Sequence, residues 1–375
     1  MDPTIELLRD LVAIDSVNPS LVPGAAGERV IADAIAQEMR SVGLDIAVDE
    51  ARPGRPNVVG VLDGRAPGRT LVFCGHLDTV GVEGMASPFD PVVRDGRLYG
   101  RGAQDMKGGV AAMMGAARAL AGTLDRGRLV VAAVADEEYA SVGAEALVTT
   151  LTADAAVVTE PTDLQVAVGH KGFAWVEIET RGRAAHGSRP RDGRDAILRM
   201  GRVLARLERL DRELQARAPH PILGTGSLHA SIVTGGRELS SYPDRCALQM
   251  ERRILTGESP DLALDEVMAI LADLRAEDPE FDATATMPFG RRPYEIPGDH
   301  ELTRTLSAVL REMGREPVVS GMSFWTDAAV LGHAGIPSLL FGPSGAGLHS
   351  VEEYVEIDSV LACRDALAAL ARRFC

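Results

Sequence analysis

The sequence predicts an α/β domain with a mostly parallel central sheet and helices on both faces, interrupted by a smaller, open-faced α+β domain. Short runs that are apolar throughout alternate with helical stretches in the first part of the chain and again near its end. Such runs are typical of parallel strands that are covered on both faces. Between residues 170 and 289 the order becomes strand–helix–strand–strand–helix–strand, which indicates a separate sheet with antiparallel pairing. We therefore assign residues 1–169 and 290–375 to one domain and residues 170–289 to an inserted one.

The elements of the first domain follow from the spacing of its apolar residues. Strands are expected where a short apolar run lies between turn residues, at 57–62, 70–74, 128–135, 155–158 and 337–341. Helices are expected where apolar residues recur every three or four positions, at 4–14, 28–42, 106–120, 141–151, 300–313 and 358–374. Gly43 follows the second of these helices and is a typical residue to end it.

The inserted domain is predicted in the same way. Its expected strands are 172–180, 227–233, 247–255 and 283–287. Its expected helices are the arginine-rich stretch 192–216 and residues 260–276. A chain of 375 residues is long enough for two such domains, each with its own core.

The composition argues against several classes of function. The formal net charge of -15 argues against a surface for nucleic acid or for anionic membranes. No apolar run is long enough to cross a bilayer, and the start lacks the basic and then apolar stretch of a secretory signal, so we expect a cytoplasmic protein. The four cysteines lie far apart and form no C-x-x-C pair. A metal would therefore be held by histidine and carboxylate side chains.

Histidine and acidic residues follow the predicted strands at the point where each strand ends. In an open α/β sheet, this is the edge where ligands bind. The residues concerned follow four predicted strands or precede the helix that begins near residue 106: His76, Asp78, Asp105, Glu137, Glu138, Glu160 and His349. Two histidines together with at least three carboxylates are a ligand set suited to a pair of metal ions.

Each of these residues alone also has an ordinary structural explanation. Asp105 could cap the helix that it precedes, and Glu137 and Glu138 could be solvated acids in a first helical turn. Glu160 could belong to a turn, and His349 could lie in a surface loop. The prediction of a metal centre depends on the whole set, because chance would seldom place so many ligand types at adjacent strand ends.

The strings around these residues resemble the motifs of a zinc metallopeptidase family. Its members include acetylornithine deacetylase, succinyl-diaminopimelate desuccinylase, aminoacylase and glutamate carboxypeptidase. The matching strings are Gly75-His76-Leu77-Asp78-Thr79-Val80, residues 99–109 around Asp105, Asp136-Glu137-Glu138, Thr159-Glu160-Pro161-Thr162 and His349-Ser350-Val351-Glu352-Glu353. The resemblance extends through nearly the whole chain. It implies a zinc-peptidase-like catalytic domain with an inserted lid or dimerisation domain.

The resemblance implies a site for two zinc ions, with cobalt or manganese as possible substitutes. Its ligands would be His76, Asp105, Glu138, Glu160 and His349. Asp105 would bridge the two ions. His76 and Glu160 would complete one site. Glu138 and His349 would complete the other. Glu137 would act as the general base toward the metal-bridging hydroxide, and Asp78 would bind the far imidazole nitrogen of His76.

Two residues of the inserted domain match family motifs on the substrate side. His186 lies in a string like the family's lid motif, whose histidine stabilises the tetrahedral oxyanion, often from the partner subunit of a dimer. Arg253 resembles the arginine that receives a substrate carboxylate, although it could equally be paired with a nearby acid; Arg252 is the alternative register. Ser240 and Thr256 stand where many relatives carry Asn and Pro. The resemblance therefore says less about the substrate of this protein than about its reaction.

These observations favour a metal-dependent amidohydrolase that acts on a non-ring amide bond. Most like acetylornithine deacetylase, it would remove the acyl group from an N-acyl amino acid. The alternative is a metallo-carboxypeptidase or dipeptidase of the same family, which would use the same metals and base on a short peptide. A binding or regulatory protein that keeps the fold would be expected to lack a ligand or the base, and none is missing. The lid motif favours a homodimer.

Overall fold

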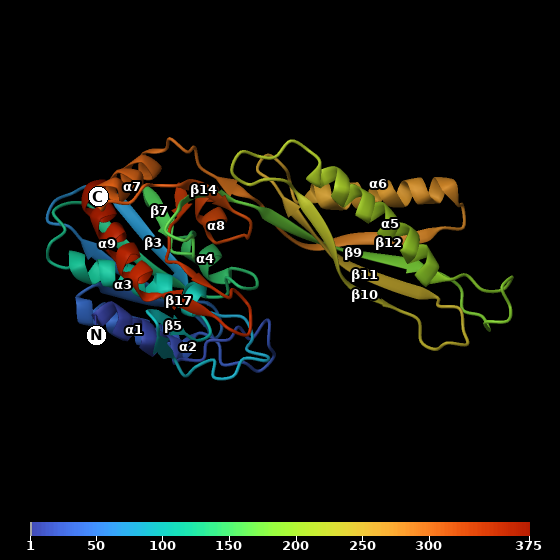
Figure 1. Cartoon of the computed structure of the whole chain (residues 1–375), viewed down its shortest axis with the longest axis horizontal. Coiled ribbons are helices and arrows are strands. Elements are labelled where there is room, and N and C mark those ends of the chain that lie inside the picture. Colours follow the sequence, from blue (N-terminus) through green and yellow to red (C-terminus); the bar gives the residue numbers. More distant parts are fainter. Residues whose placement is uncertain (1) are drawn as a thin grey trace. The chain divides into compact units, whose positions relative to one another are not determined.

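The computed structural model describes residues 2–375, which divide into two compact units (Figure 1). Unit 1 comprises residues 2–169, Glu295–Gly321 and Thr326–Cys375. Unit 2 comprises His170–Tyr294 and Met322–Trp325. It is therefore an insertion within unit 1, and a short later segment of the chain also belongs to it. Among residues 2–375 we find no helix with the length and hydropathy of a membrane span.

Unit 1 is built on a mixed sheet whose middle strands run parallel. These are, in order, β6 (Arg128–Val134), β3 (Thr70–His76), β7 (Ala155–Val158) and β15 (Ser338–Leu340). The antiparallel strands β2 (Arg55–Asp63) and β1 (Asp45–Arg52) extend one side, and β8 (Val166–His170), β13 (Tyr294–Glu295) and β14 (Val319–Met322) lie on the other. Because β3, β6 and β7 are buried along almost their whole length, both faces of the sheet must be covered. The predicted fold class is confirmed.

Helices provide this cover. They are α1 (Pro3–Val12), α2 (Arg29–Val42), α3 (Gly108–Leu120), α4 (Val142–Leu147), α7 (Glu301–Glu312), α8 (Ala328–His333) and α9 (Ile357–Phe374). The helix α3 packs on β3 and β6 and against α1 and α9, and its small residues allow this close approach. The helix α2 ends, as predicted, at Gly43, whose φ of 88° is a left-handed conformation that glycine adopts without strain.

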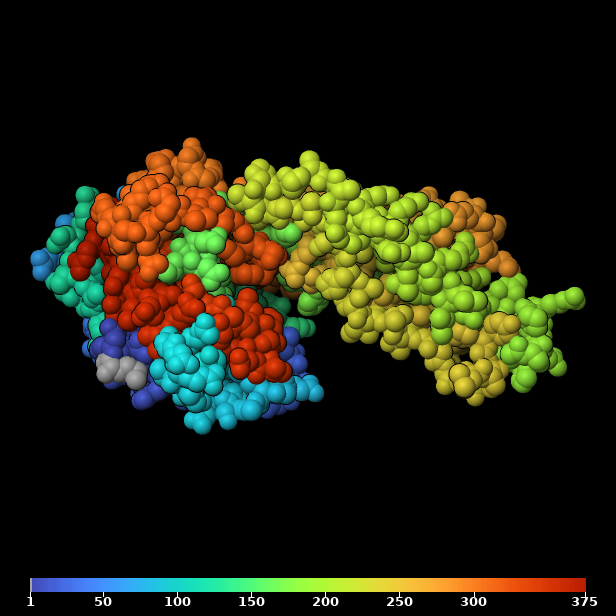
Figure 2. Space-filling model, viewed as in Figure 1, coloured from blue at the N-terminus to red at the C-terminus, as the bar shows by residue number. Residues whose placement is uncertain are grey.

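A second, small sheet brings two distant loops together in unit 1. Its order is β16 (Gly345–Ala346), β17 (Tyr354–Glu356), β5 (Arg97–Tyr99) and β4 (Val92–Arg94). Because β17 pairs with β5, the loop 347–353 lies beside the segment that follows Tyr99. Figure 2 shows residues near 350, in red, against residues near 90, in cyan. The pairing therefore brings the segment that contains Asp105 close to the loop that contains His349.

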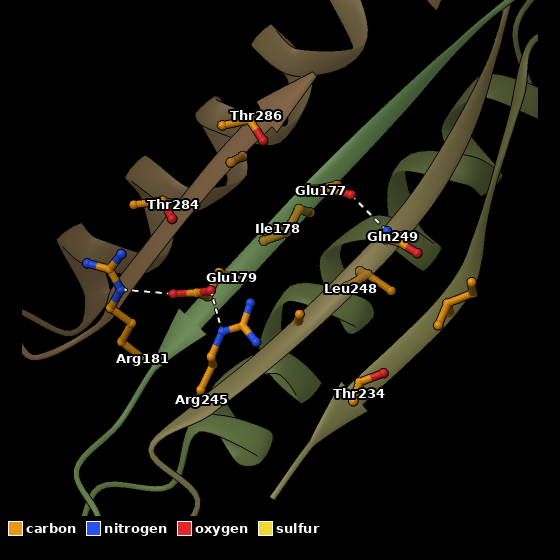
Figure 3. Close-up of a pocket in the computed structure, with 13 residues that line it drawn as sticks. Glu177, Ile178, Glu179, Arg181, Thr234, Arg245, Leu248, Gln249, Thr284 and Thr286 are labelled. Atoms are coloured by element: carbon orange, nitrogen blue, oxygen red, sulfur yellow. Dashed lines mark hydrogen bonds and ion pairs between the residues drawn. The ribbon is translucent and has the colours of Figure 1, made fainter. Parts of the chain in front are cut away.

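Unit 2 is an antiparallel sheet with helices on one face (Figure 1). Its elements are β9 (Gly172–Arg181), α5 (Ala196–Gln215), β10 (Ser227–Gly235), β11 (Arg245–Ile254), α6 (Asp261–Glu277) and β12 (Asp282–Arg291). The strands lie in the order β10–β11–β9–β12. Alternate residues of β9 and β11, such as Val176 and Leu248, form a core with α5 and α6. The opposite face is open and carries a hollow of about 550 Å³ (Figure 3).

The structure contains strands that apolar periodicity did not indicate. The clearest is β1, in which six of eight residues are exposed. An edge strand with exposed side chains lacks the apolar pattern by which strands are predicted. The strand β8 was also not predicted, because it contains Gly169, near which the pattern of the sequence changes. The helix α3 begins at Gly108 rather than near Met106, because Asp105 and Met106 have non-helical backbone angles.

Candidate metal centre

Three neighbouring parallel strands deliver the first group of candidate residues. His76 is the last residue of β3, Glu137 and Glu138 follow β6, and Glu160 follows β7. The strand β3 pairs in parallel with both β6 and β7. The carboxyl ends of all three strands therefore meet at one edge of the sheet, where open α/β sheets place their ligands.

Asp105 and His349 reach the same edge from loops that a buried acid holds together. The carboxylate of Glu353 accepts hydrogen bonds from the main-chain N–H groups of Gly102, Gln104 and Asp105 at 3.0, 2.9 and 3.0 Å. It also accepts one from Nη1 of Arg101 at 2.6 Å. Nη2 of the same arginine donates to the carbonyl of Ser350, the residue after His349, at 3.0 Å. One contact network thus fixes both loops.

Five side chains gather into two groups that share Asp105. In the first group, Nε2 of His76 lies 3.0 Å from Oδ1 of Asp105 and 3.8 Å from Oε1 of Glu160. In the second, Nε2 of His349 lies 3.3 Å from Oδ2 of Asp105 and 3.2 Å from Oε2 of Glu138. Within each group, the possible ligand atoms all lie within 4.8 Å of one another. One carboxylate thus offers an oxygen to each group, as a ligand between two metal ions would.

Glu137 lies beside the first group and belongs to neither group. Its Oε2 is 4.0 Å from Nε2 of His76, and its side chain is 10% exposed. The next residue, Glu138, belongs to the group of His349. Two adjacent carboxylates therefore occupy different positions. A carboxylate that binds no metal keeps its basicity and can accept a proton.

Asp78 contacts His76 through a different atom from the one predicted. Nδ1 of His76 is 2.9 Å from the main-chain oxygen of Asp78 but 3.7 Å from its carboxylate Oδ1. A carbonyl oxygen can only accept a hydrogen bond, so this contact places a proton on Nδ1 of His76. The other ring nitrogen, Nε2, then faces Asp105. The carboxylate instead accepts from the main-chain N–H groups of Glu137 and Glu138, both at 3.1 Å. The predicted contact is thus corrected: the backbone makes it, because the carboxylate faces the end of β6.

The electrostatics of this edge fit a bound cation. Burial, followed by the charges of neighbouring carboxylates, raises the pKa of Glu137 and Glu160 well above the usual range and that of Glu138 to about 6. Hydrogen bonds to Asp105 and Glu138 raise the pKa of His349 to about 10. Oε1 of Glu138 is buried and has no hydrogen-bond partner among residues 2–375. Divalent metal ions would provide both the positive charge and this partner, and imidazole with carboxylate is a donor set suited to zinc, cobalt or manganese.

His186 and Arg253 belong to unit 2. His186 is exposed, and its Nδ1 accepts from the main-chain N–H of Ser188 at 3.2 Å. A neutral His186 therefore carries its proton on Nε2 and can donate it outward. Nε of Arg253 lies 2.7 Å from Oε1 of Glu251, and the side chain is 30% exposed. The guanidinium also lies 5.7 Å above the ring of Phe173.

Arg252 does not share the open face with Arg253. Its side chain is 0% exposed and lies on the side that the helices cover. It pairs with Glu266 of α6 at 3.1 Å and with Glu258 at 3.4 Å. Successive residues of a strand point to opposite faces, so only one of the two arginines can reach the open face. The structure therefore removes Arg252 as the alternative register.

Sequence reasoning gave no role to Glu353, although it lay within a matching string. The sequence did contain a signal, because Glu353 is an acid four residues after His349. It directly precedes the short strand β17, which pairs with β5. Its use became visible only in the structure, because its partners lie 248 to 252 residues earlier in the chain.

Comparison with known proteins agrees with this geometry. Residues 72–373 match the family model for peptidase family M20/M25/M40. An acetylornithine deacetylase from Myxococcus xanthus is 31% identical over 88% of this chain and 86% of its own length. A tripeptidase from Staphylococcus aureus has a similar structure, with a TM-score of 0.81 and 21% identity over 99% and 98% of the two chains.

A dinuclear metal-binding peptidase from Bacillus subtilis has the same fold, with a TM-score of 0.73 and 17% identity over 98% and 96% of the two chains. The family match covers most of the chain, and the deacetylase is similar along nearly its whole length. The chain is therefore a metal-dependent hydrolase of amide bonds and belongs to peptidase family M20/M25/M40.

Proposed function

We propose that this enzyme hydrolyses the amide bond of an N-acyl amino acid, with two zinc ions held by His76, Asp105, Glu138, Glu160 and His349. The observation that carries the proposal is the position of Asp105. Its two carboxylate oxygens lie 3.0 and 3.3 Å from Nε2 of His76 and Nε2 of His349, which belong to different groups. When bound, such metal ions lower the pKa of water and polarise the amide carbonyl.

The side chains around this centre divide the remaining work. Glu137 takes the proton of the attacking water as the new carbon–oxygen bond forms, and passes it to the nitrogen as the carbon–nitrogen bond breaks. The products are the carboxylate of the acyl group and the free amine. Asp78 holds the imidazole of His76 with its carbonyl and the main chain of Glu137 with its carboxylate. His186 donates its Nε2–H to the developing oxyanion.

The substrate class is supported by similarity along the chain. Three relatives named acetylornithine deacetylase are 28% to 31% identical and are aligned with 88% to 100% of this chain. The two peptidases of known structure described above are 21% and 17% identical, so they support the fold alone. Arg253 would bind the carboxylate of the amino acid after releasing Glu251, with which it now pairs.

A substrate panel tests this proposal. Metal-free protein is assayed with N-acetyl amino acids and with dipeptides, before and after Zn²⁺ or Co²⁺ is added, and its metal content is measured. We expect hydrolysis to require metal and kcat/KM for the best N-acetyl amino acid to exceed that for dipeptides by about tenfold or more. A preference for dipeptides would replace deacylase by the peptidase alternative. No hydrolysis of either class by metal-loaded protein would contradict both.

We further propose a homodimer in which His186 serves the partner's centre. The test is co-expression of H186A and E137Q chains, each inactive alone. If His186 acts across the dimer, mixed dimers contain one centre with both residues intact, and random pairing restores about a quarter of wild-type activity. If it acts within its own chain, no centre is complete and the mixture stays inactive.

A further inference from the structure

Asn18 connects two buried carboxylates, those of Asp78 and Asp136, next to the turn that contains Glu137 and Glu138. Nδ2 of Asn18 donates to Oδ2 of Asp78 at 2.7 Å and to Oδ1 of Asp136 at 3.0 Å. Asn18 and Asp78 are 0% exposed and Asp136 is 2% exposed. The three residues are far apart in sequence, at separations of 60 and 118 residues from Asn18. The bridge therefore exists only in the folded chain.

The neighbours of Asn18 determine how its amide is oriented. Its Oδ1 accepts from the main-chain N–H of Ser20 at 2.8 Å. The carboxylates of Asp78 and Asp136 can only accept when they are ionised, so the NH₂ group must face them. The opposite orientation would bring three oxygens together without a proton between them. Asn18 is thus a donor shared by two acids.

Each of the two acids holds one part of the turn, Asp78 through its carboxylate and Asp136 through its main chain. Asp78 holds its middle, because it accepts from the main-chain N–H groups of Glu137 and Glu138, both at 3.1 Å. Asp136 begins the turn with a φ of 69°, a left-handed conformation that is uncommon for a residue other than glycine. Its carbonyl accepts from the N–H groups of the residues that close the turn, among them Ala140 at 3.1 Å.

A second buried donor contacts the same carboxylate oxygen of Asp136. Nη2 of Arg55 donates to Oδ1 of Asp136 at 2.8 Å and also to Glu28. Oε1 of Glu28 accepts in turn from the main-chain N–H of Asp136 at 3.2 Å. Asn18 and Arg55 together supply hydrogen-bond donors to Asp136 and Asp78. These donors offset the repulsion between the two buried carboxylates.

We propose that Asn18 is a positioning residue: through Asp78 and Asp136 it fixes the main chain of the turn so that Glu138 faces the metal ligands while Glu137 faces the substrate as base. The catalytic part of this inference rests on the proposed function, whereas its structural part does not. Asn18 and Arg55 precede residue 72, where the match to the family model begins.

Two substitutions distinguish donation from packing. N18D keeps the shape of the side chain and the bond to Ser20, but it turns the shared donor into an acceptor. N18A removes the amide altogether. If Asn18 acts as a donor, both variants lose about 10- to 100-fold in kcat, N18D at least as much as N18A, while KM changes by less than about threefold. Near-wild-type turnover of N18D would overturn the proposal.

Asn57 offers a matched control. It is also buried, at 4% exposed, and it bonds the two ends of the same turn: Nδ2 donates to the carbonyl of Gly143 at 2.8 Å and Oδ1 accepts from Ala135 N–H at 3.1 Å. It bonds neither Asp78 nor Asp136. We expect N57A to lower Tm as much as N18A does but to keep kcat within about threefold of wild type. Equal losses of kcat in N57A and N18A would contradict a specific role for Asn18.

A second measurement needs neither metal nor substrate. In metal-free protein, the amides of Glu137 and Glu138 should exchange hydrogen about tenfold faster or more in N18A and N18D, while those of β7 keep their rates. Unchanged exchange at the turn, or a uniform increase across unit 1, would overturn the proposal. If exchange changes as expected but the wild-type chain hydrolyses nothing with any metal, the proposed function fails and the positioning of the turn stands.

Discussion

The candidate metal centre of unit 1 and the open face of unit 2 both carry acidic side chains on or beside strands, but in different surroundings. At the metal centre, the side chains of Glu138 and Glu160 are 7% and 5% exposed. On the open face, Glu179 pairs with Arg181 and Arg245, whose side chains are 54% and 66% exposed (Figure 3). The acids of the metal centre are thus buried with few positively charged side chains nearby. The acid of the open face is neutralised by arginines that are in contact with water.

This difference shows that concave shape alone does not identify the chemistry of the molecule. The hollow on unit 2 contains both acids and arginines, yet among residues 2–375 the groups able to hold a metal are both in unit 1. Charges in water interact weakly, whereas buried charges interact strongly and must be matched. Substitutions should therefore have large effects at the metal centre and small ones on the open face.

The largest effect is expected from Glu137. E137Q keeps the size of the side chain but cannot accept the proton, so kcat should fall by about 10²- to 10⁴-fold. Because Glu137 belongs to neither ligand group, the variant should bind as much zinc as the wild type. Single-turnover kinetics and metal analysis measure the two quantities. Loss of zinc together with activity would make Glu137 a ligand instead of a base.

The next effect concerns the two loops that Glu353 holds. E353Q exchanges an acceptor of four hydrogen bonds for an amide, one end of which donates, and should weaken zinc binding by about 10- to 100-fold. The neighbouring Glu352 is exposed, so E352Q is the matched control and should bind zinc as the wild type does. Competition with a chelator gives both affinities. Equal affinities in the two variants would remove Glu353 as a support of the centre.

Removal of the metal should make stability depend on pH. Without metal, the pKa values of Glu137 and Glu160 are raised by burial, and that of His349 is raised to about 10. Above about pH 4.5 these three groups bind more protons in the folded chain than in the unfolded chain, so their contribution to stability falls as pH rises toward 8. The Tm of chelated protein should decrease over this range more steeply than that of zinc-loaded protein. Parallel curves would contradict the burial of unmatched carboxylates.

The smallest effect is expected on the open face of unit 2, and a buried ion pair of the same unit provides the contrast. R252M breaks the buried pairs with Glu258 and Glu266 and should reduce the free energy of unfolding by about 3 kcal/mol. E179Q breaks exposed pairs and should change it by less than about 1 kcal/mol. Urea unfolding followed by tryptophan fluorescence reports on this unit, since both tryptophans lie in it. A larger effect for E179Q would contradict the comparison.

Local pattern was sufficient to predict the parallel strands and most helices, because buried strands and amphipathic helices impose their spacing on the sequence. The edge strand β1 was missed, since its exposed side chains are under no such constraint. At the metal centre, strand ends indicated where His76, Glu138 and Glu160 would meet, because parallel neighbours bring their carboxyl ends together.

The sequence by itself determined which residue types stand at the ends of the strands, and so the kind of chemistry available. Only the tertiary structure decided how they are held. It placed the carbonyl of Asp78, rather than its carboxylate, on His76, and it brought Asn18 and Glu353 beneath residues that lie far away in the chain. Hydrogen bonds between such distant segments depend on how the chain packs, and packing leaves no periodic trace in the sequence.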